Sequence, residues 1–317
     1  MIEMSTPLVS IACITYNHKP YIRQCLEGFV MQQTNFDFEI VIHDDASTDG
    51  TKDIIIEYST KYPHLFRPIF QKVNRFKEGR GICARFVFPE CRGKYIALCE
   101  GDDYWTDPLK LQKQVDILEN DSFVGCVYTR YLTVDVASNV CEFLPAEHHQ
   151  RRSFTGDIFS ALMYGNFPQT LTVLFRKDLL DFSFAPPSEI DYSLFLKLAI
   201  QKDFYFLQDV TGAYRINPNG LIQSGEFFKN DTQGLLMYYY CQYLKHPHFK
   251  RTIKNDLKIH WAFLRNLCYV SNFRNNSRCF QEVIRNFPFI IVPIVLFCLL
   301  NGITAKLRKY IRILWLD

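Results

Sequence analysis

Short apolar runs alternate with amphipathic stretches along the first two thirds of the chain. Apolar runs at 8–14, 38–43 and 95–99 each end abruptly in polar residues. Helix-like spacing of apolar residues follows the first run from Pro20 to about Gln33, and it follows the second run around 54–58. Alternation of buried strands with helices predicts an α/β fold with a right-handed, mostly parallel sheet. Ligands of such sheets bind beyond the carboxyl ends of the strands.

The same patterns predict the remaining elements of this first part. We expect further strands at 65–70, 123–128, 171–175 and 204–209, a hairpin at 132–143, and helices at 109–118 and 189–199. The loop at 145–155 carries an exposed His148-His149 pair, which we interpret as solvated and not as a metal site.

Carboxylates follow the strand predicted at 95–99. Asp102 and Asp103 stand next to each other there, and adjacent carboxylates at a sheet edge repel each other unless a cation relieves them. Hard divalent ions prefer carboxylate oxygens, and Mg²⁺ shares its coordination shell with substrate phosphates. The stretch therefore predicts Mg²⁺ or Mn²⁺ bound together with a nucleotide diphosphate. The alternative is an acidic turn that caps the helix starting near Pro108, and the motif alone leaves the two interpretations even.

Composition indicates a globular protein of a reducing compartment. Of the 317 residues, 48% are hydrophobic and 22% are charged. The eleven cysteines are scattered and form no C-x-x-C pair, so neither a disulfide framework nor a zinc site is indicated. The first residues do not resemble a secretory signal, so we expect a cytoplasmic protein.

Charge divides the chain into two parts. Residues 245–317 contain 13 Lys and Arg and 3 Asp and Glu, so this part is basic. Residues 1–244 contain 23 Lys and Arg and 30 Asp and Glu, so that part is acidic. The tail also contains an uncharged run at 287–300, which is too short to span a bilayer, and a basic amphipathic end at 306–316. We expect this end to lie on the inner face of the cytoplasmic membrane. Packing on protein is the alternative, and although nucleic acid would also attract such a tail, we expect no nucleic-acid partner.

Residues 8 to about 135 carry several motifs in a characteristic order. These are Thr15-Tyr16-Asn17, then Asp44-Asp45-Ala46-Ser47-Thr48-Asp49-Gly50-Thr51, then Gly93-Lys94-Tyr95-Ile96, and last Gly101-Asp102-Asp103-Tyr104-Trp105 with Asp107-Pro108. On these motifs the chain resembles the inverting nucleotide-sugar glycosyltransferases of family 2, whose catalytic domain has the Rossmann-like GT-A fold.

The resemblance implies roles for the motif residues. Asp45 would accept a hydrogen bond from the nucleotide base, and Thr15 and Tyr16 would line the pocket for the base and the ribose. Asp102 would contact the ribose or the sugar, and Asp103 would bind the metal that bridges the phosphates. Further candidates for donor binding are Asn17, Asp44 and Arg85, with Trp105 as a weaker one.

Two later positions complete the implied site. Asp191 opens a Leu-rich helix, where a carboxylate is also explained as a good helix start, and the resemblance implies that it is the general base, with Glu189 as the alternative. Relatives often carry Tyr-Arg-x-His where this chain has Tyr214-Arg215-Ile216-Asn217. Arg215 and Asn217 are therefore candidates near the diphosphate, and the third protein ligand of the metal stays open.

The resemblance predicts transfer of a hexosyl or other glycosyl group, with inversion, from a nucleoside-diphosphate sugar, most simply a UDP-sugar. The acceptor would be a saccharide or lipid-linked hydroxyl in surface polysaccharide synthesis. We expect a catalytic domain at 1–222 and a helical, membrane-associating region at 223–317. The alternatives are a nucleotidyltransferase, although no P-loop occurs, and a non-catalytic scaffold that binds a sugar nucleotide at the membrane. A carboxylate-pair glycosidase is less favoured because hydrolysis has no use for both acidic loops.

Overall fold

The computed structural model describes residues 6–78, 81–141, 154–180 and 191–218, together with short stretches between 235 and 262. The chain divides into two compact units, one formed by residues 1–158 with 166–225 and the other by 159–165 with 226–317. The expected boundary between 222 and 223 lies outside the described residues and stays a prediction. In the part of the chain that is described, no helix has both the length and the apolar character needed to cross a membrane.

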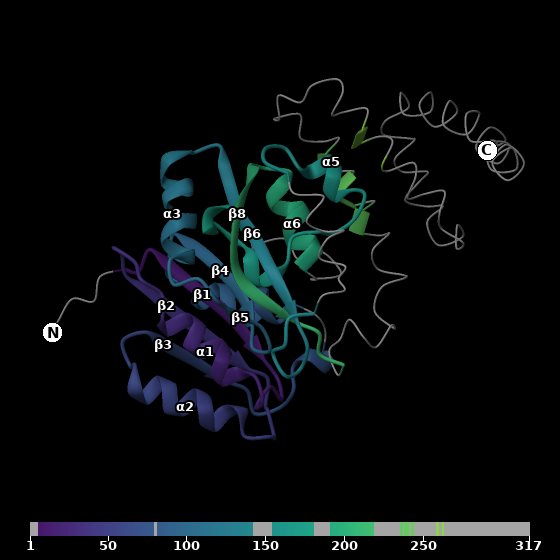
Figure 1. Cartoon of the computed structure of the whole chain (residues 1–317). Helices are drawn as coiled ribbons and strands as arrows, with labels where there is room; N and C mark the ends of the chain where they lie inside the picture. The colour runs from purple at the N-terminus through teal and green to yellow at the C-terminus, as the bar shows by residue number, and fades with distance from the viewer. Residues whose placement is uncertain are drawn as a thin grey trace, which may run out of the picture. The chain divides into compact units, whose positions relative to one another are not determined.

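The first unit is built on one eight-stranded sheet with the order β3-β2-β1-β4-β7-β6-β8-β5 (Figure 1). The strands are β1 Val9–Thr15, β2 Phe38–Asp44, β3 Phe66–Phe70, β4 Tyr95–Glu100, β5 Tyr104–Trp105, β6 Val124–Val134, β7 Leu174–Arg176 and β8 Asp203–Arg215. Parallel pairing joins β1 to β2 and β4, β2 to β3, and β6 to β8. The short strands β5 and β7 pair antiparallel with their neighbours. The predicted α/β class is thus confirmed.

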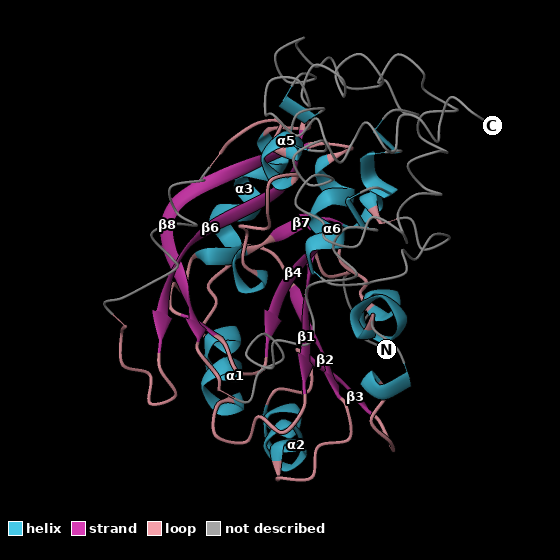
Figure 2. Cartoon of the chain, turned by 90° about the vertical axis from the view of Figure 1, so that its right-hand side faces the viewer, coloured by secondary structure: helices cyan, strands magenta, loops and turns pink. Residues whose placement is uncertain are grey.

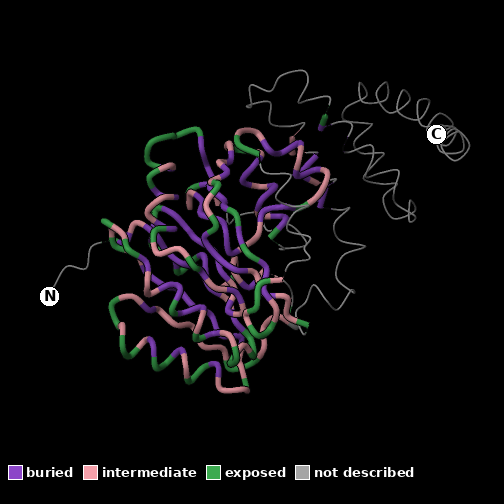
Figure 3. The backbone as a smooth tube through the Cα atoms, in the orientation of Figure 1, coloured by how far each residue is buried: buried purple, intermediate pink, exposed green. Residues whose placement is uncertain are grey.

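Helices cover the sheet on both faces, with α1 on one side and α6 on the other (Figure 2). Their bounds are α1 Ile22–Val30, α2 Thr51–Lys61, α3 Lys110–Asn120 and α6 Asp191–Ala199, and α5 Phe159–Leu162 belongs to the second unit. Alternate residues of β1 (Val9, Ile11, Cys13) join one core cluster with the apolar faces of α1, α2 and α3. The strands form the buried centre of this unit (Figure 3).

Two sequence-based bounds differ from the structure, and one strand was missed. The strand expected at 171–175 begins as a 3-10 turn, Thr170–Thr172 (η4), and only Leu174–Arg176 is β7. Strand β8 extends through Arg215, so the Tyr-Arg pair lies in the strand and not after it. The short β5 was not predicted, because two residues show no periodicity and are placed only by pairing with β8.

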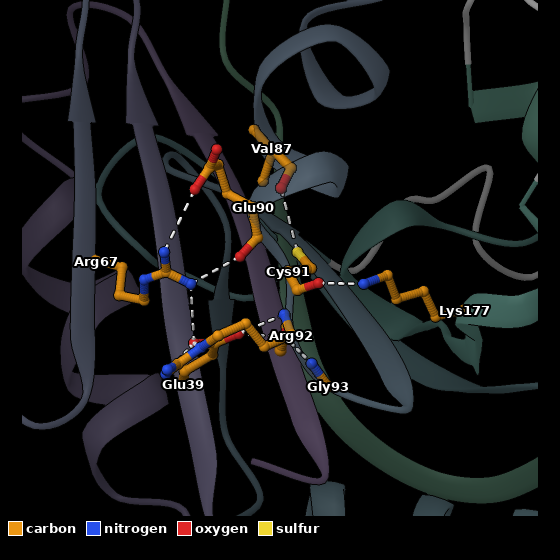
Figure 4. A network of polar contacts seen from close by, with 9 residues as sticks. Glu39, Arg67, Val87, Glu90, Cys91, Arg92, Gly93 and Lys177 are labelled. Carbon is orange, nitrogen blue, oxygen red and sulfur yellow. Dashed lines mark hydrogen bonds and ion pairs between the residues drawn. The ribbon is translucent and has the colours of Figure 1, made fainter. Parts of the chain in front are cut away.

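A buried carboxylate locks the amino-terminal edge of the sheet (Figure 4). Glu39, at the start of β2, accepts hydrogen bonds from Ser10 Oγ and from the backbone N–H of Arg92, both at 2.7 Å. Its second oxygen accepts from Arg92 Nε at 2.8 Å and pairs with Arg67 at 3.4 Å. These bonds join β1, β2, β3 and the segment before β4, on the opposite edge from the candidate site.

Candidate functional site

The carboxyl ends of β1, β2 and β4 meet at one edge of the sheet. Thr15 pairs with Asp44 across β1 and β2, and the backbone N–H of Asp45 donates to the Thr15 carbonyl at 3.0 Å. On the other side of β1, the N–H of Gly101 donates to the carbonyl of Ile14 at 2.9 Å. The structure therefore brings the three polar segments that follow these strands into contact, as the sequence predicted.

Asn17 holds the first two loops together. It adopts a left-handed conformation with φ of 53°, its backbone N–H donates to Ser47 Oγ at 2.8 Å, and its Oδ1 accepts from the N–H of Thr48 at 2.8 Å. The adjacent Tyr16 side chain is exposed. Of these two candidates, Asn17 is engaged in shaping the loop, whereas Tyr16 is open to solvent.

The two acidic residues at the end of β2, Asp44 and Asp45, are both buried but are bonded differently. Asp45 accepts from the backbone N–H groups of Arg75 and Phe76 at 2.7 and 3.0 Å, so the loop at 74–76 closes over it. Asp44 accepts from the N–H of Ser47 at 3.1 Å through Oδ2, while its Oδ1 has no partner. Asp45 therefore holds the loop at 74–76, whereas Asp44 keeps one oxygen that accepts no hydrogen bond.

The acid pair after β4 is held from the end of β8. Asp103 is buried, and its Oδ1 accepts from the backbone N–H of Arg215 at 2.8 Å. Asp102 Oδ2 accepts from Asn217 Nδ2 at 3.1 Å and lies 3.7 Å from His18 Nε2. The candidates Asp102, Asp103, Arg215 and Asn217 thus form one cluster.

The Arg215 guanidinium is engaged in holding backbone. Its Nε donates to the Asp102 carbonyl at 2.8 Å, one amino group donates to the Asp135 carbonyl at 3.0 Å, and the other donates to Gln24 Oε1 at 2.7 Å. It also stacks over Tyr21, with its central carbon 4.7 Å from the ring centroid. Arg215 therefore ties the acid pair to α1 and to the hairpin after β6.

Asp191 begins α6, and its Oδ2 accepts from Thr170 Oγ1 at 3.1 Å. Its side chain reaches solvent. Desolvation by the surrounding atoms nevertheless raises the pKa of this carboxyl above its ordinary value, and the Thr170 hydrogen bond offsets part of the rise. The charge of Asp191 in turn helps to raise the pKa values of Glu100 and Asp103, after desolvation. The structure therefore places Asp191 in electrostatic reach of Glu100 and Asp103.

The remaining candidates differ in position. Trp105 is buried, and its indole N–H donates to the Leu171 carbonyl at 2.9 Å, so it supports the site from inside the core. Arg85 is exposed, pairs with Glu78 at 3.5 Å and lies over Phe86. Glu189 lies outside the described residues, as do His148 and His149.

Carboxylate chemistry around Asp103 fits a divalent ion that takes further ligands from a substrate. Burial and the charge of Asp102 raise the pKa of Asp103, and burial with the charges of Asp191, Asp102 and Asp103 raises that of Glu100. A cation would relieve this repulsion. No group of three or more His, Cys, Asp or Glu side chains suited to a metal occurs among the residues placed in the structure.

Unpartnered polar atoms gather at the same edge. Within the described residues, five buried side-chain atoms lack a hydrogen-bond partner: Thr15 Oγ1, His18 Nδ1, His43 Nδ1, Asp44 Oδ1 and Arg75 Nε. All five belong to the ends of β1 and β2 or to the loops beside them. Buried polar groups are normally satisfied, so a cluster of exceptions indicates a place where a polar ligand binds.

Sequence reasoning left two contacting residues out of its site. His18 lies beside Asp102, and a Cβ on Gly101 would sit 3.0 Å from His18 Nδ1 and 2.6 Å from Thr15 Oγ1. Its place directly after Thr15-Tyr16-Asn17 was the available signal. Thr170 gave no signal, because its bond to Asp191 spans 21 residues and depends on the η4 turn.

Comparison with known proteins agrees with this geometry. Residues 10–159 match the profile of glycosyl transferase family 2. An uncharacterized protein of Mycobacterium tuberculosis is 40% identical over 220 residues, which cover 68% of this chain and 61% of that protein. The chain thus spans about three fifths of the length of this relative.

Two solved structures show the same fold at low identity. Staphylococcus aureus TarS 1–349 in complex with UDP-GlcNAc superposes with a TM-score of 0.62 and 17% identity, covering 88% of this chain and 80% of that one. The mannosyltransferase PcManGT of Pyrobaculum calidifontis, in complex with GDP-Man and Mn²⁺, superposes with a TM-score of 0.56 and 16% identity, covering 98% and 84%. The segment 10–159 of this chain therefore belongs to glycosyl transferase family 2, and the sheet, to which β7 and β8 add strands from beyond that segment, has the fold of these two structures.

Proposed function

We propose that the protein transfers a glycosyl group, with inversion, from a nucleoside-diphosphate sugar to an acceptor hydroxyl. The observation that carries this proposal is the edge at which β1, β2 and β4 end. Unpartnered buried atoms of Thr15, His18 and Asp44 occur at this edge, and the buried acid Asp103 follows β4 there. Such an edge offers donors and acceptors to a nucleoside and carboxylates to the ion that accompanies a diphosphate.

In this proposal each side chain has one task. Thr15, Tyr16 and Asp45 bind the nucleoside, Asp102 contacts the ribose or sugar, and Asp103 holds Mg²⁺ or Mn²⁺. A divalent ion bound there would neutralise the charge that develops on the departing diphosphate. Arg215 and Asn217 keep the acid pair in place.

Asp191 acts as general base. It takes the proton of the acceptor hydroxyl, the acceptor oxygen forms its bond to the anomeric carbon, and the bond from that carbon to the phosphate oxygen breaks with its electron pair leaving on the nucleoside diphosphate. A single displacement of this kind inverts the anomeric configuration. The raised pKa of Asp191 supports the assignment, since a base works best when its pKa approaches the working pH.

The donor is a UDP-sugar in the simplest form of the proposal. TarS was solved with UDP-GlcNAc and PcManGT with GDP-Man, so both nucleotides belong in the first screen. Thermal-shift measurements with UDP-GlcNAc and GDP-Man, each with and without Mn²⁺, test donor binding. Release of the nucleoside diphosphate supports transfer, whereas release of pyrophosphate would indicate a nucleotidyltransferase, and binding without any turnover would indicate a scaffold.

The acceptor and the site of action are proposed from the tail. A saccharide or lipid-linked acceptor for surface polysaccharide synthesis, and attachment to the inner face of the cytoplasmic membrane, both rest on residues 287–317, which lie outside the described part. Flotation of the full chain with vesicles containing anionic lipid tests the attachment. Equal flotation after deletion of 287–317 would refute it.

A further inference from the structure

Three buried side chains hold the η4 turn from inside the core. Trp105 Nε1 donates to the carbonyl of the turn's second residue at 2.9 Å. Gln114 Nε2 and Lys110 Nζ donate to the carbonyl of its third residue at 2.9 and 3.1 Å. Lys110 also donates to Gln114 Oε1 at 2.6 Å and lies 5.0 Å from the centroid of the Trp105 ring. We call these three side chains the buttress.

Burial of Lys110 in this buttress is energetically unfavourable. Lys110 is completely buried, and among the described residues it forms no ion pair. Burial lowers its pKa to about 7. An apolar residue of similar size would cost less in such a position, so the hydrogen bonds to the turn are the physical gain that the lysine offers.

The buttress connects two parts of the candidate site. Trp105 follows Asp103 by two residues in the chain, so its backbone moves with the acid pair. The first residue of η4, Thr170, donates its hydroxyl to Asp191 Oδ2 at 3.1 Å. A short, continuous path therefore runs from the acid pair through the turn to the carboxylate at the start of α6.

We propose that Thr170 is a positioning residue for Asp191 and that the buttress sets this pair relative to Asp103. The inference rests on the proposed function, in which Asp191 is the base. A hydrogen bond to one carboxylate oxygen restricts rotation of the group and leaves the other oxygen for the acceptor. Small errors in the placement of a reacting group cost large factors in rate, so a rigid support for the base has a direct catalytic use.

The first test measures Asp191 itself and needs no substrate. The ¹³C chemical shift of its carboxyl carbon, assigned by comparison with Asp191→Asn, gives the pKa of Asp191 in the wild type and in Thr170→Val. Because the hydroxyl bond lowers this pKa, its loss should raise it, while the neighbouring charges of Glu100, Asp102 and Asp103 stay the same. Thr170→Ser keeps a hydroxyl and should return the pKa toward the wild-type value.

The second test measures turnover of UDP-GlcNAc with Mn²⁺. Thr170→Val should lower kcat about 10-fold with the donor KM unchanged, in line with loss of one hydrogen bond to a charged group. Gln114→Leu removes one hydrogen-bond donor of the buttress without changing the charge. It should also lower kcat. Thr34→Val is the matched control, because it removes the bond from Thr34 Oγ1 to the Phe36 carbonyl in the loop before β2, at the amino-terminal end of the sheet.

Wild-type values of both the Asp191 pKa and kcat in Thr170→Val would overturn the inference. If the wild type fails to turn over UDP-GlcNAc, that result counts against this donor in the proposed function, and the NMR comparison still decides whether Thr170 and the buttress hold Asp191.

Discussion

The backbone N–H of Arg215 donates to Asp103 Oδ1 at 2.8 Å, although 112 residues separate the two in the chain. Arg215 is the last residue of β8, and Asp103 follows β4, which is not a neighbour of β8 in the sheet. The acid that we assign to the metal is thus oriented by the final strand. Its geometry depends on the whole sheet being formed.

Arg215→Lys should weaken binding of Mn²⁺ with UDP by about 10-fold, because lysine cannot make the forked contacts to Asp102, Asp135 and Gln24. Calorimetric titration of Mn²⁺ and UDP measures the effect. Arg23→Lys is the control, since Arg23 makes an exposed pair with Glu57 that contributes little. Equal affinity in both variants would contradict the role of Arg215.

Asp103→Asn should remove most Mn²⁺ binding, because a neutral amide is a poor substitute for a carboxylate ligand of a hard ion. Electron paramagnetic resonance of free Mn²⁺ measures the bound fraction in the presence of UDP. Asp116→Asn on α3 serves as control, because Asp116 is exposed and, within the described part of the chain, accepts a side-chain hydrogen bond only from Gln112. Undiminished Mn²⁺ binding by Asp103→Asn would exclude it as a ligand.

Asp191→Asn should lower kcat by about 10²- to 10⁴-fold, the range for loss of a general base, with nucleotide affinity unchanged. The comparison of kcat with the dissociation constant for UDP separates the base role from a binding role. Retention of most activity at saturating donor would remove Asp191 from the mechanism.

The pH dependence of kcat should follow the raised pKa of Asp191. The base accepts a proton only as the carboxylate, so kcat should fall as the pH falls through a value above that of an ordinary aspartate. A pH–rate profile of the wild type shows this limb, and the residual activity of Asp191→Asn should lack it. If kcat of Asp191→Asn still falls at low pH, that pH dependence comes from another titrating group and not from Asp191.

Glu39→Gln should lower the free energy of unfolding by about 2 kcal/mol, because it removes the buried negative charge that pairs with Arg92 and, more weakly, with Arg67, which keeps its contacts to Glu90. Urea unfolding measures the loss, and Glu57→Gln, in an exposed pair, is the control. An unchanged unfolding midpoint in Glu39→Gln would contradict the importance of this network.

Glu39 also predicts how stability varies with pH. Burial by itself would raise the pKa of this carboxyl, but hydrogen bonds from Arg92 and Ser10 outweigh burial and lower it. The contribution of Glu39 is therefore complete above the ordinary glutamate pKa and is lost as the pH falls through the lowered, folded-state value. In Glu39→Gln this part of the pH dependence should disappear.

Local sequence patterns were sufficient to predict the sheet and the edge of the sheet at which the candidate site lies. The runs that became β1, β2 and β4 are continuous and apolar because both faces of these strands are covered, and the alternation with helices required parallel pairing. Parallel pairing in turn brings Thr15, Asp45 and Asp103 to one side, whatever the details of the loops.

Contacts between distant segments were beyond the reach of such patterns. No periodicity shows that Thr170 meets Asp191, that Trp105 donates to the η4 turn, or that Arg215 orients Asp103. Each of these bonds depends on a turn, a two-residue strand or a strand end whose place is set by packing. The strands can be predicted from the sequence because their apolar residues follow one another in the chain and are buried together. The exact position of a catalytic group depends on hydrogen bonds between distant segments, and these form only when the sheet has folded.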